Sequence, residues 1–135
     1  IRLFTYKKKL LEMMELLNMD ESYAERDLNV GFSGGEKKKA EILQLLMLEP
    51  SLAILDETDS GLDVDAVRTV SRGIQIYQER CKGSLLIITH STKILESLHV
   101  DVTHVMENGI VVKEGDASLV DVINENGFTE LRDEK

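Results

Sequence analysis

The stretch "LAILDETDSGLDVD", Leu52 to Asp65, decides the expected fold. It begins with a short apolar run that follows a proline, which is typical of a buried parallel strand. Two acidic residues end this run, and a polar turn rich in small residues comes next. Asp63 or a neighbour then caps a long helix that runs to about Glu79. The stretch therefore predicts a strand, a turn and a helix in direct succession.

A second unit of the same kind follows further along the chain. "SLLIITH", Ser84 to His90, reads as another buried strand, again with polar residues at its C-terminal end. Ser91 or Thr92 caps a helix to about Leu98. Because strands that alternate with helices form parallel sheets, we expect an α/β fold here.

The remaining segments complete the expected organisation. "VTHVMENGIVVKEG", residues 102–115, predicts a hairpin with Asn108 and Gly109 in its turn. A closing helix is expected at about 117–126, with Gly127 just past its end.

The first 49 residues contain helical patterns only. Helices are expected at residues 5–18 and at about 34–48. We therefore divide the chain into a helical segment, residues 1–49, and half of an α/β domain with its terminal hairpin and helix, residues 50–135.

The second of these helices begins in an unusual way, within "NVGFSGGEKKKAEI". Ser33 and Glu36 have the spacing of a helix capping box. Gly34 and Gly35 lie between them, although each glycine costs about 1 kcal/mol of helix propensity relative to alanine. Bare glycines at a helix N-terminus let an anion such as phosphate reach unpaired N–H groups. The alternative is an ordinary capped helix with a flexible start.

Reactive side chains follow both predicted strands. Asp56 and Glu57 end the first, and burying two carboxylates without partners costs several kcal/mol each. A magnesium ion would suit the first carboxylate, and the second could then activate a water molecule. The alternative is that both cap the following turn. His90 ends the second strand and can donate to a phosphate oxygen, although a lone histidine is more often structural.

Composition limits the classes of function. The chain has 135 residues, 42% hydrophobic and 30% charged, which suits one soluble globular domain. Its net charge of −9 argues against a broad nucleic-acid surface. The only cysteine, Cys81, excludes an internal disulfide and fits a reducing, intracellular compartment. Neither a signal peptide nor an apolar run long enough to span a membrane is visible.

Four motifs in one order resemble those of the ATP-binding cassette (ABC) family. They are the signature motif Ser33-Gly34-Gly35-Glu36, the Walker B strand Leu52 to Asp56 with the catalytic glutamate Glu57, the D-loop Ser60-Gly61-Leu62-Asp63 and the switch histidine His90. Phe32 and Glu36 stand where the family often has Leu and Gln. The resemblance covers the chain from about residue 5 onward and implies a P-loop NTPase fold, with half of the parallel sheet core and part of the helical subdomain.

The resemblance also implies a role for each matching residue. Asp56 would hold Mg²⁺, Glu57 would activate water, and His90 would contact the phosphate of ATP. In this family two cassettes pair head to tail, so the signature helix of one faces ATP held by the other. The nucleotide contacts implied in this way are Ser33, Gly34, Gly35, Glu36 and Asp63.

Within the family, the SufC-type ATPases of iron–sulfur cluster assembly fit best. Transporter cassettes usually have a proline after the catalytic glutamate, where this chain has Thr58. The ending "ENGFTELRDEK" is also similar, whereas Lys39-Ala40 departs from the expected Arg and polar residue. The resemblance implies SufB- and SufD-like scaffold proteins as partners, ATP hydrolysis that drives their rearrangement, and a bacterial cytosol or plastid stroma as location. No iron–sulfur cluster is expected on this chain, because one cysteine cannot hold it.

One part of the family pattern is absent from the sequence. No G-x-x-x-x-G-K-[ST] string, which would carry the Walker A lysine, occurs in the 135 residues, and neither do the adenine-stacking aromatic loop and the Q-loop glutamine. We therefore expect an ATPase in the full-length parent and no useful turnover by these residues alone.

Three other functions stay open. The nucleotide-binding subunit of a membrane transporter would use the same chemistry with a different partner. A DNA-repair or chromosome-maintenance ATPase also has an S-G-G-E signature, but it needs a long coiled coil that residues 5–18 do not supply. An inert cassette that serves only as an interaction module is the third.

Overall fold

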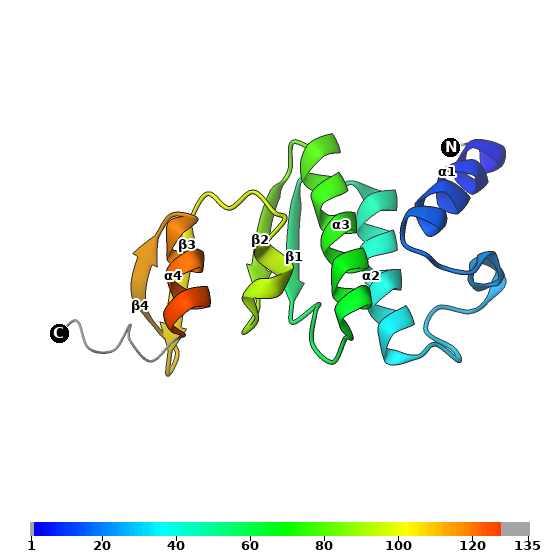
Figure 1. Ribbon diagram of the computed structural model, residues 1–135. Coiled ribbons are helices and arrows are strands. Elements are labelled where there is room, and N and C mark those ends of the chain that lie inside the picture. The colour runs from blue at the N-terminus through cyan, green and yellow to red at the C-terminus, as the bar shows by residue number, and fades with distance from the viewer. Residues whose placement is uncertain (1, 128–135) are drawn as a thin grey trace. The chain divides into compact units, whose positions relative to one another are not determined.

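The computed structural model describes residues 2–127, which form helices and strands in the expected alternation (Figure 1). The elements, with η for a 3₁₀ helix, are α1 (Leu3–Leu16), η1 (Glu21–Glu25), α2 (Gly34–Leu48), β1 (Leu52–Asp56), α3 (Val64–Arg80), β2 (Ser84–Ile88), η2 (Thr92–Leu95), β3 (Thr103–Glu107), β4 (Ile110–Gly115) and α4 (Ser118–Asn126). They fall into two compact units, one up to Ser97 and one from Leu98 onward.

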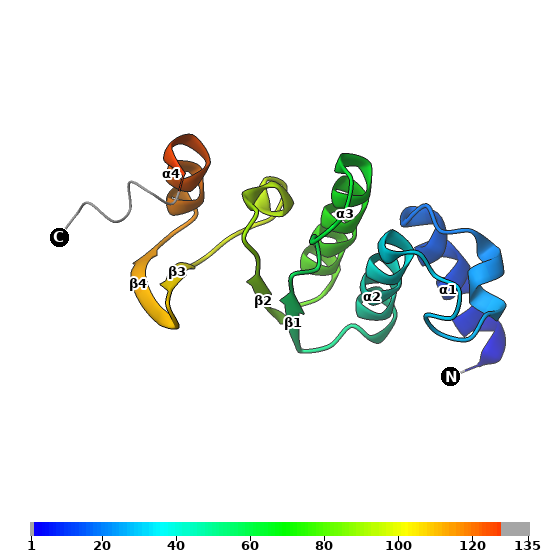
Figure 2. The ribbon, with the colours of Figure 1, turned by 90° about the horizontal axis from the view of Figure 1, so that it is seen from below.

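Two parallel strands form the sheet of the first unit. β1 pairs with β2 in parallel from Leu52 opposite Ser84 to Asp56 opposite Ile88, which confirms the predicted α/β arrangement. α3 connects the two strands, and Figures 1 and 2 show α3 and η2 on the same side of the pair. Both strands therefore end at the same edge of the sheet.

The expectation that both strands are buried is wrong for one face of β1 and for β2, in which no residue is buried. Side chains alternate between the two faces of a strand. Ala53 and Leu55 of β1 are buried, whereas Leu52 and Ile54 are 57% and 60% exposed. The reason is that the described helices of this unit cover only one side of the sheet.

The core of the first unit lies between α2 and α3. Gly73 of α3 lets Ile42 of α2 and Leu17 come close, because a side chain at this position would overlap both. Tyr77 of α3 is fully buried, and its hydroxyl donates to the carbonyl oxygen of Pro50 at 2.7 Å. These contacts fix α3 between α2 and the start of β1.

α1 and η1 pack beside α2 in the same unit. Met13, Met14 and Leu17 form the buried side of α1 and its end. The subdivision expected between residues 49 and 50 therefore falls inside a single compact unit. The assignment of residues 1–49 and 50–135 to two subdomains of a larger cassette stays a prediction.

The second unit is a hairpin with one helix. β3 and β4 pair antiparallel, and the turn residues Asn108 and Gly109 both have positive φ, 51° and 78°, as the sequence predicts. Leu119 and Ile123 of α4 pack on Val105 of β3. The ending "ENGFTELRDEK", which is expected to be similar to that of SufC-type ATPases, lies outside the described residues from residue 128 onward.

The helix expected from residue 92 to 98 is wrong in length and type. Only Thr92–Leu95 are helical, as a 3₁₀ helix, and no side chain caps it at Ser91. Without a capping side chain the start of a helix loses about 1 kcal/mol of stability, which favours a short helix over a long one. Within residues 2–127, no helix is both long and apolar enough to cross a membrane.

Candidate functional site

Glu57 stands at the carboxyl edge of the sheet, one residue past β1. Its N–H donates to the carbonyl oxygen of Ile88 at 2.8 Å, which extends the pairing of the strands by one step. Its φ of 50° lies in the left-handed region, where residues other than glycine are uncommon. Its carbonyl oxygen accepts from the N–H of Ser60 at 3.1 Å. The backbone of Glu57 is therefore held in a strained conformation from both sides.

The structure brings the predicted pair Glu57 and His90 into contact. Oε2 of Glu57 and Nδ1 of His90 are 2.7 Å apart, with side-chain exposures of 40% and 73%. When Nδ1 donates its proton to the carboxylate, Nε2 is the nitrogen left to meet a ligand. The pair is thus preformed and open to solvent at the end of the two strands.

Asp56, the predicted metal ligand, is the last residue of β1 and is exposed. In the part of the chain that the structure describes, no group of three or more His, Cys, Asp or Glu side chains could hold a metal ion alone. Magnesium typically binds one or two carboxylates together with water and substrate phosphates. One exposed carboxylate therefore suits a magnesium ion shared with a phosphate ligand.

The start of α2 has the predicted capping box. The N–H of Glu36 donates to Oγ of Ser33 at 3.3 Å, and the N–H of Ser33 donates to Oε2 of Glu36 at 2.7 Å. A Cβ added to Gly34 would meet nothing within 4 Å, and one added to Gly35 would only reach Leu62 at 3.9 Å. The packing of this chain therefore gives no reason for these two glycines.

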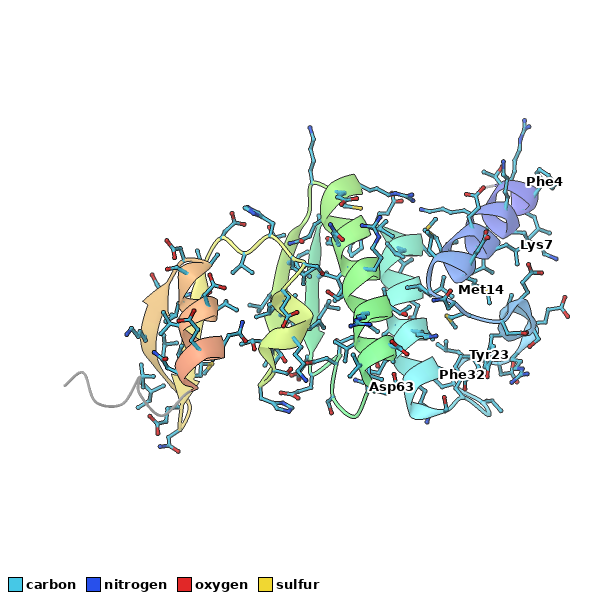
Figure 3. The ribbon with its side chains drawn as sticks, in the orientation of Figure 1. Phe4, Lys7, Met14, Tyr23, Phe32 and Asp63 are labelled. Atoms are coloured by element: carbon cyan, nitrogen blue, oxygen red, sulfur yellow. The ribbon has the colours of Figure 1, made fainter. Side chains whose placement is uncertain are left out.

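A contact that the sequence did not predict holds this helix start in place. The hydroxyl of Tyr23, in η1, donates to Oε1 of Glu36. The Tyr23 ring meets Phe32 edge to face with centroids 4.7 Å apart, and the guanidinium of Arg26 lies 4.3 Å from the same ring (Figure 3). Tyr23 and Ser33 together lower the pKa of Glu36 to about 2. No pattern in the sequence connects a loop tyrosine to a residue 13 positions later.

Asp63 occupies the start of α3, at the same end of the unit (Figure 3). Its Oδ1 accepts from the N–H of Ala66 at 2.8 Å, which confirms the predicted cap. Leu62 beside it is the nearest side chain to Gly35. The structure therefore places the starts of α2 and α3 close together, while Glu57 and His90 form the pair at the strand ends.

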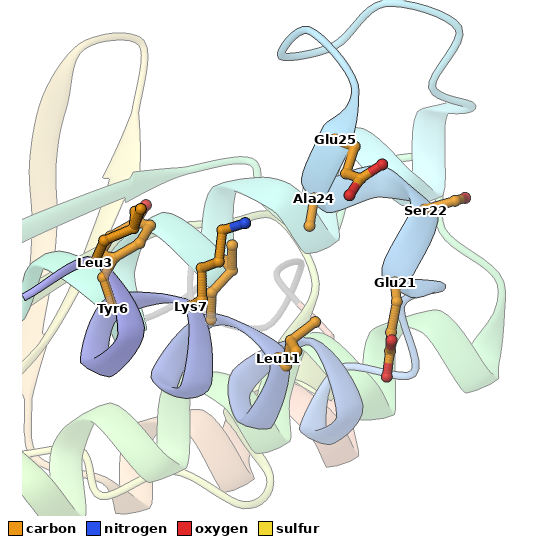
Figure 4. A pocket seen from close by; sticks show the side chains of 9 residues that line it. Leu3, Tyr6, Lys7, Leu11, Glu21, Ser22, Ala24 and Glu25 are labelled. Carbon is orange, nitrogen blue, oxygen red and sulfur yellow. The ribbon is translucent and has the colours of Figure 1, made fainter.

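A pocket between α1 and η1 is separate from these residues (Figure 4). It is lined by Leu3, Tyr6, Lys7, Leu10, Leu11, Glu21, Ser22, Ala24 and Glu25. Because none of the predicted site residues lines it, this pocket is not part of the candidate site.

Comparison with known proteins identifies the relatives of the chain. No protein-family model matches it. It is 48% identical over 134 residues to Vegetative protein 296 of Bacillus subtilis, covering 99% of the chain and 51% of that protein. It is 43% identical over 132 residues to the probable ATP-dependent transporter SufC of Escherichia coli, covering 98% and 53%. A probable ABC transporter ATP-binding protein of Streptococcus pyogenes is 52% identical over 120 residues, covering 89% and 46%.

Solved structures agree on the fold. An ATP-binding cassette of an ABC transporter in its ADP conformation has a TM-score of 0.64 at 23% identity, covering 92% of this chain and 48% of that one. The ATP-binding subunit of an ABC transporter has a TM-score of 0.63 at 25% identity, covering 94% and 50%. The chain spans about half the length of the relatives that it matches. The chain belongs to the ATP-binding cassette family, and SufC is among its homologues.

Proposed function

We propose that this chain acts within a SufC-type ATPase cassette and serves two nucleotide sites. Asp56, Glu57 and His90 serve the site of its own cassette. The signature residues 33–36, with Asp63, serve the site of a second cassette in a head-to-tail dimer. SufB- and SufD-like scaffolds are the partners that ATP hydrolysis would rearrange, in a cytosol or plastid stroma. Homology to SufC and the order of the four motifs support this proposal.

The observation that carries the proposal is the contact between Glu57 and His90. A carboxylate held 2.7 Å from an imidazole, both open to solvent, can orient and deprotonate a water molecule, and in the imidazolium form, where both ring nitrogens carry a proton, Nε2 can donate to a phosphate oxygen. Asp56 would hold magnesium, which neutralises phosphate charge when it is bound. The groups needed for hydrolysis therefore come from two adjacent strand ends.

The signature helix supports the second half of the proposal. Gly34 has open space above it and Gly35 only an ordinary contact with Leu62, so an anion could reach the N–H groups at the start of α2. The hydrogen bonds of Ser33 and Glu36 keep this start ordered. A ligand held by another cassette would explain why the start of α2 lacks side chains at Gly34 and Gly35 and yet is held in an ordered conformation.

Substitution of Glu57 tests the proposal in the full-length cassette. Glu57→Gln keeps the size of the side chain and removes the base, so turnover should fall about 10²- to 10⁴-fold while ATP binding is retained. Glu79→Gln is the matched control, because this exposed residue on α3 forms an ion pair with the exposed Arg72, away from the candidate site. Unchanged turnover in Glu57→Gln would show that another group activates water.

The nucleotide-binding subunit of a membrane transporter is the second candidate. Relatives 52% identical to the chain are named as probable ABC transporter ATP-binding proteins. Thr58 in place of the usual proline after Glu57 favours the SufC-type function. Mixing the full-length protein with SufB- and SufD-like scaffolds distinguishes the two. A stable complex with stimulated ATP turnover supports the SufC-type function, whereas a stable complex only with a membrane-embedded protein supports the transporter.

A further inference from the structure

Asp59 is a buried carboxylate that the proposed chemistry does not use. It lies in the turn between β1 and α3, two residues after Glu57, yet it is only 6% exposed. Charged side chains in turns usually face water. A buried carboxylate is costly unless hydrogen bonds compensate for the lost hydration, so its partners show what it does.

The partner of Asp59 is Thr89, the residue directly before His90. Oγ1 of Thr89 lies 3.0 Å from Oδ1 and 3.1 Å from Oδ2 of Asp59. The same Oγ1 accepts from the N–H of Ser91 at 2.9 Å. The threonine hydroxyl therefore joins the turn after β1 to the turn after β2.

This hydroxyl holds the backbone that follows His90. Oγ1 of Thr89 accepts from the N–H of Ser91 at 2.9 Å and lies 3.1 Å from the carbonyl oxygen of Ser91, so a short loop closes around the histidine. Asp59 anchors that oxygen to the turn that also carries Glu57. Glu57 is itself fixed to β2 through its N–H and the carbonyl oxygen of Ile88. The turn after β1 is thus linked to the end of β2 through Glu57 and to the turn after β2 through Asp59.

We infer that Asp59 and Thr89 are positioning residues that hold Nδ1 of His90 against Glu57. The inference rests on the proposed function, because it assigns Glu57 and His90 to hydrolysis. The His90 side chain is 73% exposed, and its ring nitrogen Nδ1 lies 2.7 Å from Oε2 of Glu57, so the position of the ring depends on the turn that carries it. Without the crosslink, the turn that carries His90 can move away from β1, and the pair separates.

Thr89→Val is the variant that tests this inference. The valine side chain has nearly the same shape as threonine but lacks the hydroxyl group. Thr89→Ser keeps the hydroxyl and should restore the native behaviour. Thr69→Val is the matched control, since it removes one hydroxyl hydrogen bond, to the carbonyl oxygen of Asp65, on α3. If the Thr89→Val variant does not fold, the Thr89→Ala variant repeats the test.

The first measurement uses the 135-residue chain and the ring ¹⁵N signals of His90, which report which ring nitrogen carries the proton. The native chain and Thr89→Ser should show protonated Nδ1, the tautomer bonded to Glu57. Thr89→Val should shift the ring toward the free tautomer mixture, and Thr69→Val should not. Unchanged His90 signals in folded Thr89→Val would overturn the inference whatever the function of the protein.

The second measurement is ATP turnover in the full-length cassette, with Glu57→Gln in parallel. A misplaced catalytic group can cost about 10²-fold, so Thr89→Val should lower kcat to that extent with KM unchanged. If Glu57→Gln abolishes turnover and Thr89→Val does not reduce it, the inference is wrong and the proposed function stands. If Glu57→Gln has no effect, the proposed function is wrong, and the His90 signals alone decide whether Thr89 positions the ring.

Discussion

Glu57 shows how a single residue serves both the sheet and the site. Its left-handed φ of 50° is unfavourable for a glutamate, and strain of this kind costs on the order of 1–3 kcal/mol. Hydrogen bonds through its N–H and its carbonyl oxygen hold the conformation. Such strain is concentrated at functional positions in proteins. The backbone of Glu57 is therefore consistent with its proposed role as the base.

Tyr23 and Glu36 form the second residue-level feature. The Tyr23 hydroxyl, followed by the N–H and the side chain of Ser33, lowers the pKa of Glu36 from 4.5 to about 2. The folded chain thus binds this proton more weakly than the unfolded chain does. The stability that these bonds contribute is complete above about pH 4.5 and is lost as the pH falls toward about 2.

Tyr23→Phe should raise the pKa of Glu36 toward its ordinary value, because it removes the largest cause of the shift and keeps the ring on Phe32. Carbon-detected NMR titration of Glu36 measures this directly. The urea midpoint of Tyr23→Phe should lie below that of the native chain at pH 7, and the gap should narrow as the pH falls below 4.5. Tyr6→Phe, on the exposed side of α1, is the control. A Glu36 pKa that stays at about 2 in Tyr23→Phe would contradict the assigned cause.

At the scale of elements, glycines have two different functions. Gly73 is required by packing, since its missing side chain lets α3 approach Ile42 and Leu17. Gly34 is not, because the space above it is open. The first kind specifies how two helices cross, and the second leaves a helix N-terminus accessible.

Gly73→Ala and Gly34→Ala should therefore change stability in different ways. Alanine gains about 1 kcal/mol of helix propensity, but overpacking costs about 1–3 kcal/mol, so Gly73→Ala should destabilise the chain by up to about 2 kcal/mol. Gly34→Ala meets no neighbour and should leave the free energy of unfolding unchanged or raise it by up to about 1 kcal/mol. Urea unfolding measures both. Equal losses in the two variants would show that Gly34 is also a packing residue.

For the whole molecule, the sequence predicted the features that depend on neighbouring residues. The capping box at Ser33, the cap at Asp63 and the turn at Asn108 are confirmed because each is set by residues within one turn of helix or hairpin. The four family motifs assigned Glu57 and His90 to one site, but they did not predict the contact between the two side chains. That contact arises because β1 and β2 pair in parallel, which places both strand ends at one edge.

The features that were missed depend on contacts between distant segments. Tyr23 reaches Glu36 from η1, 13 residues earlier, and Asp59 reaches Thr89 across 30 residues, so neither contact has a local signal. The burial of the strands was overestimated because apolar residues on both faces do not reveal which face is covered. The helix after β2 is shorter than predicted, and the side chain of Ser91 does not cap it.

The central claim is that one chain serves two nucleotide sites, its own through Glu57 and a partner's through Gly35. In the full-length cassette, Gly35→Asp should retain ATP binding but block the partner's site, because its carboxylate would repel phosphate, while a Cβ at this position meets only Leu62 at 3.9 Å. Glu57→Gln should disable only its own site. Each variant alone therefore forms dimers without a competent site.

Mixing Gly35→Asp with Glu57→Gln and measuring ATP turnover tests this claim most directly. A mixed dimer has one doubly damaged site and one intact site, formed by Glu57 of the first variant and Gly35 of the second. Random pairing makes half of the dimers mixed, so an equal mixture should regain about a quarter of native turnover. If the mixture stays inactive while both variants are folded and associate, Gly35 and Glu57 do not serve different sites, and the account is contradicted.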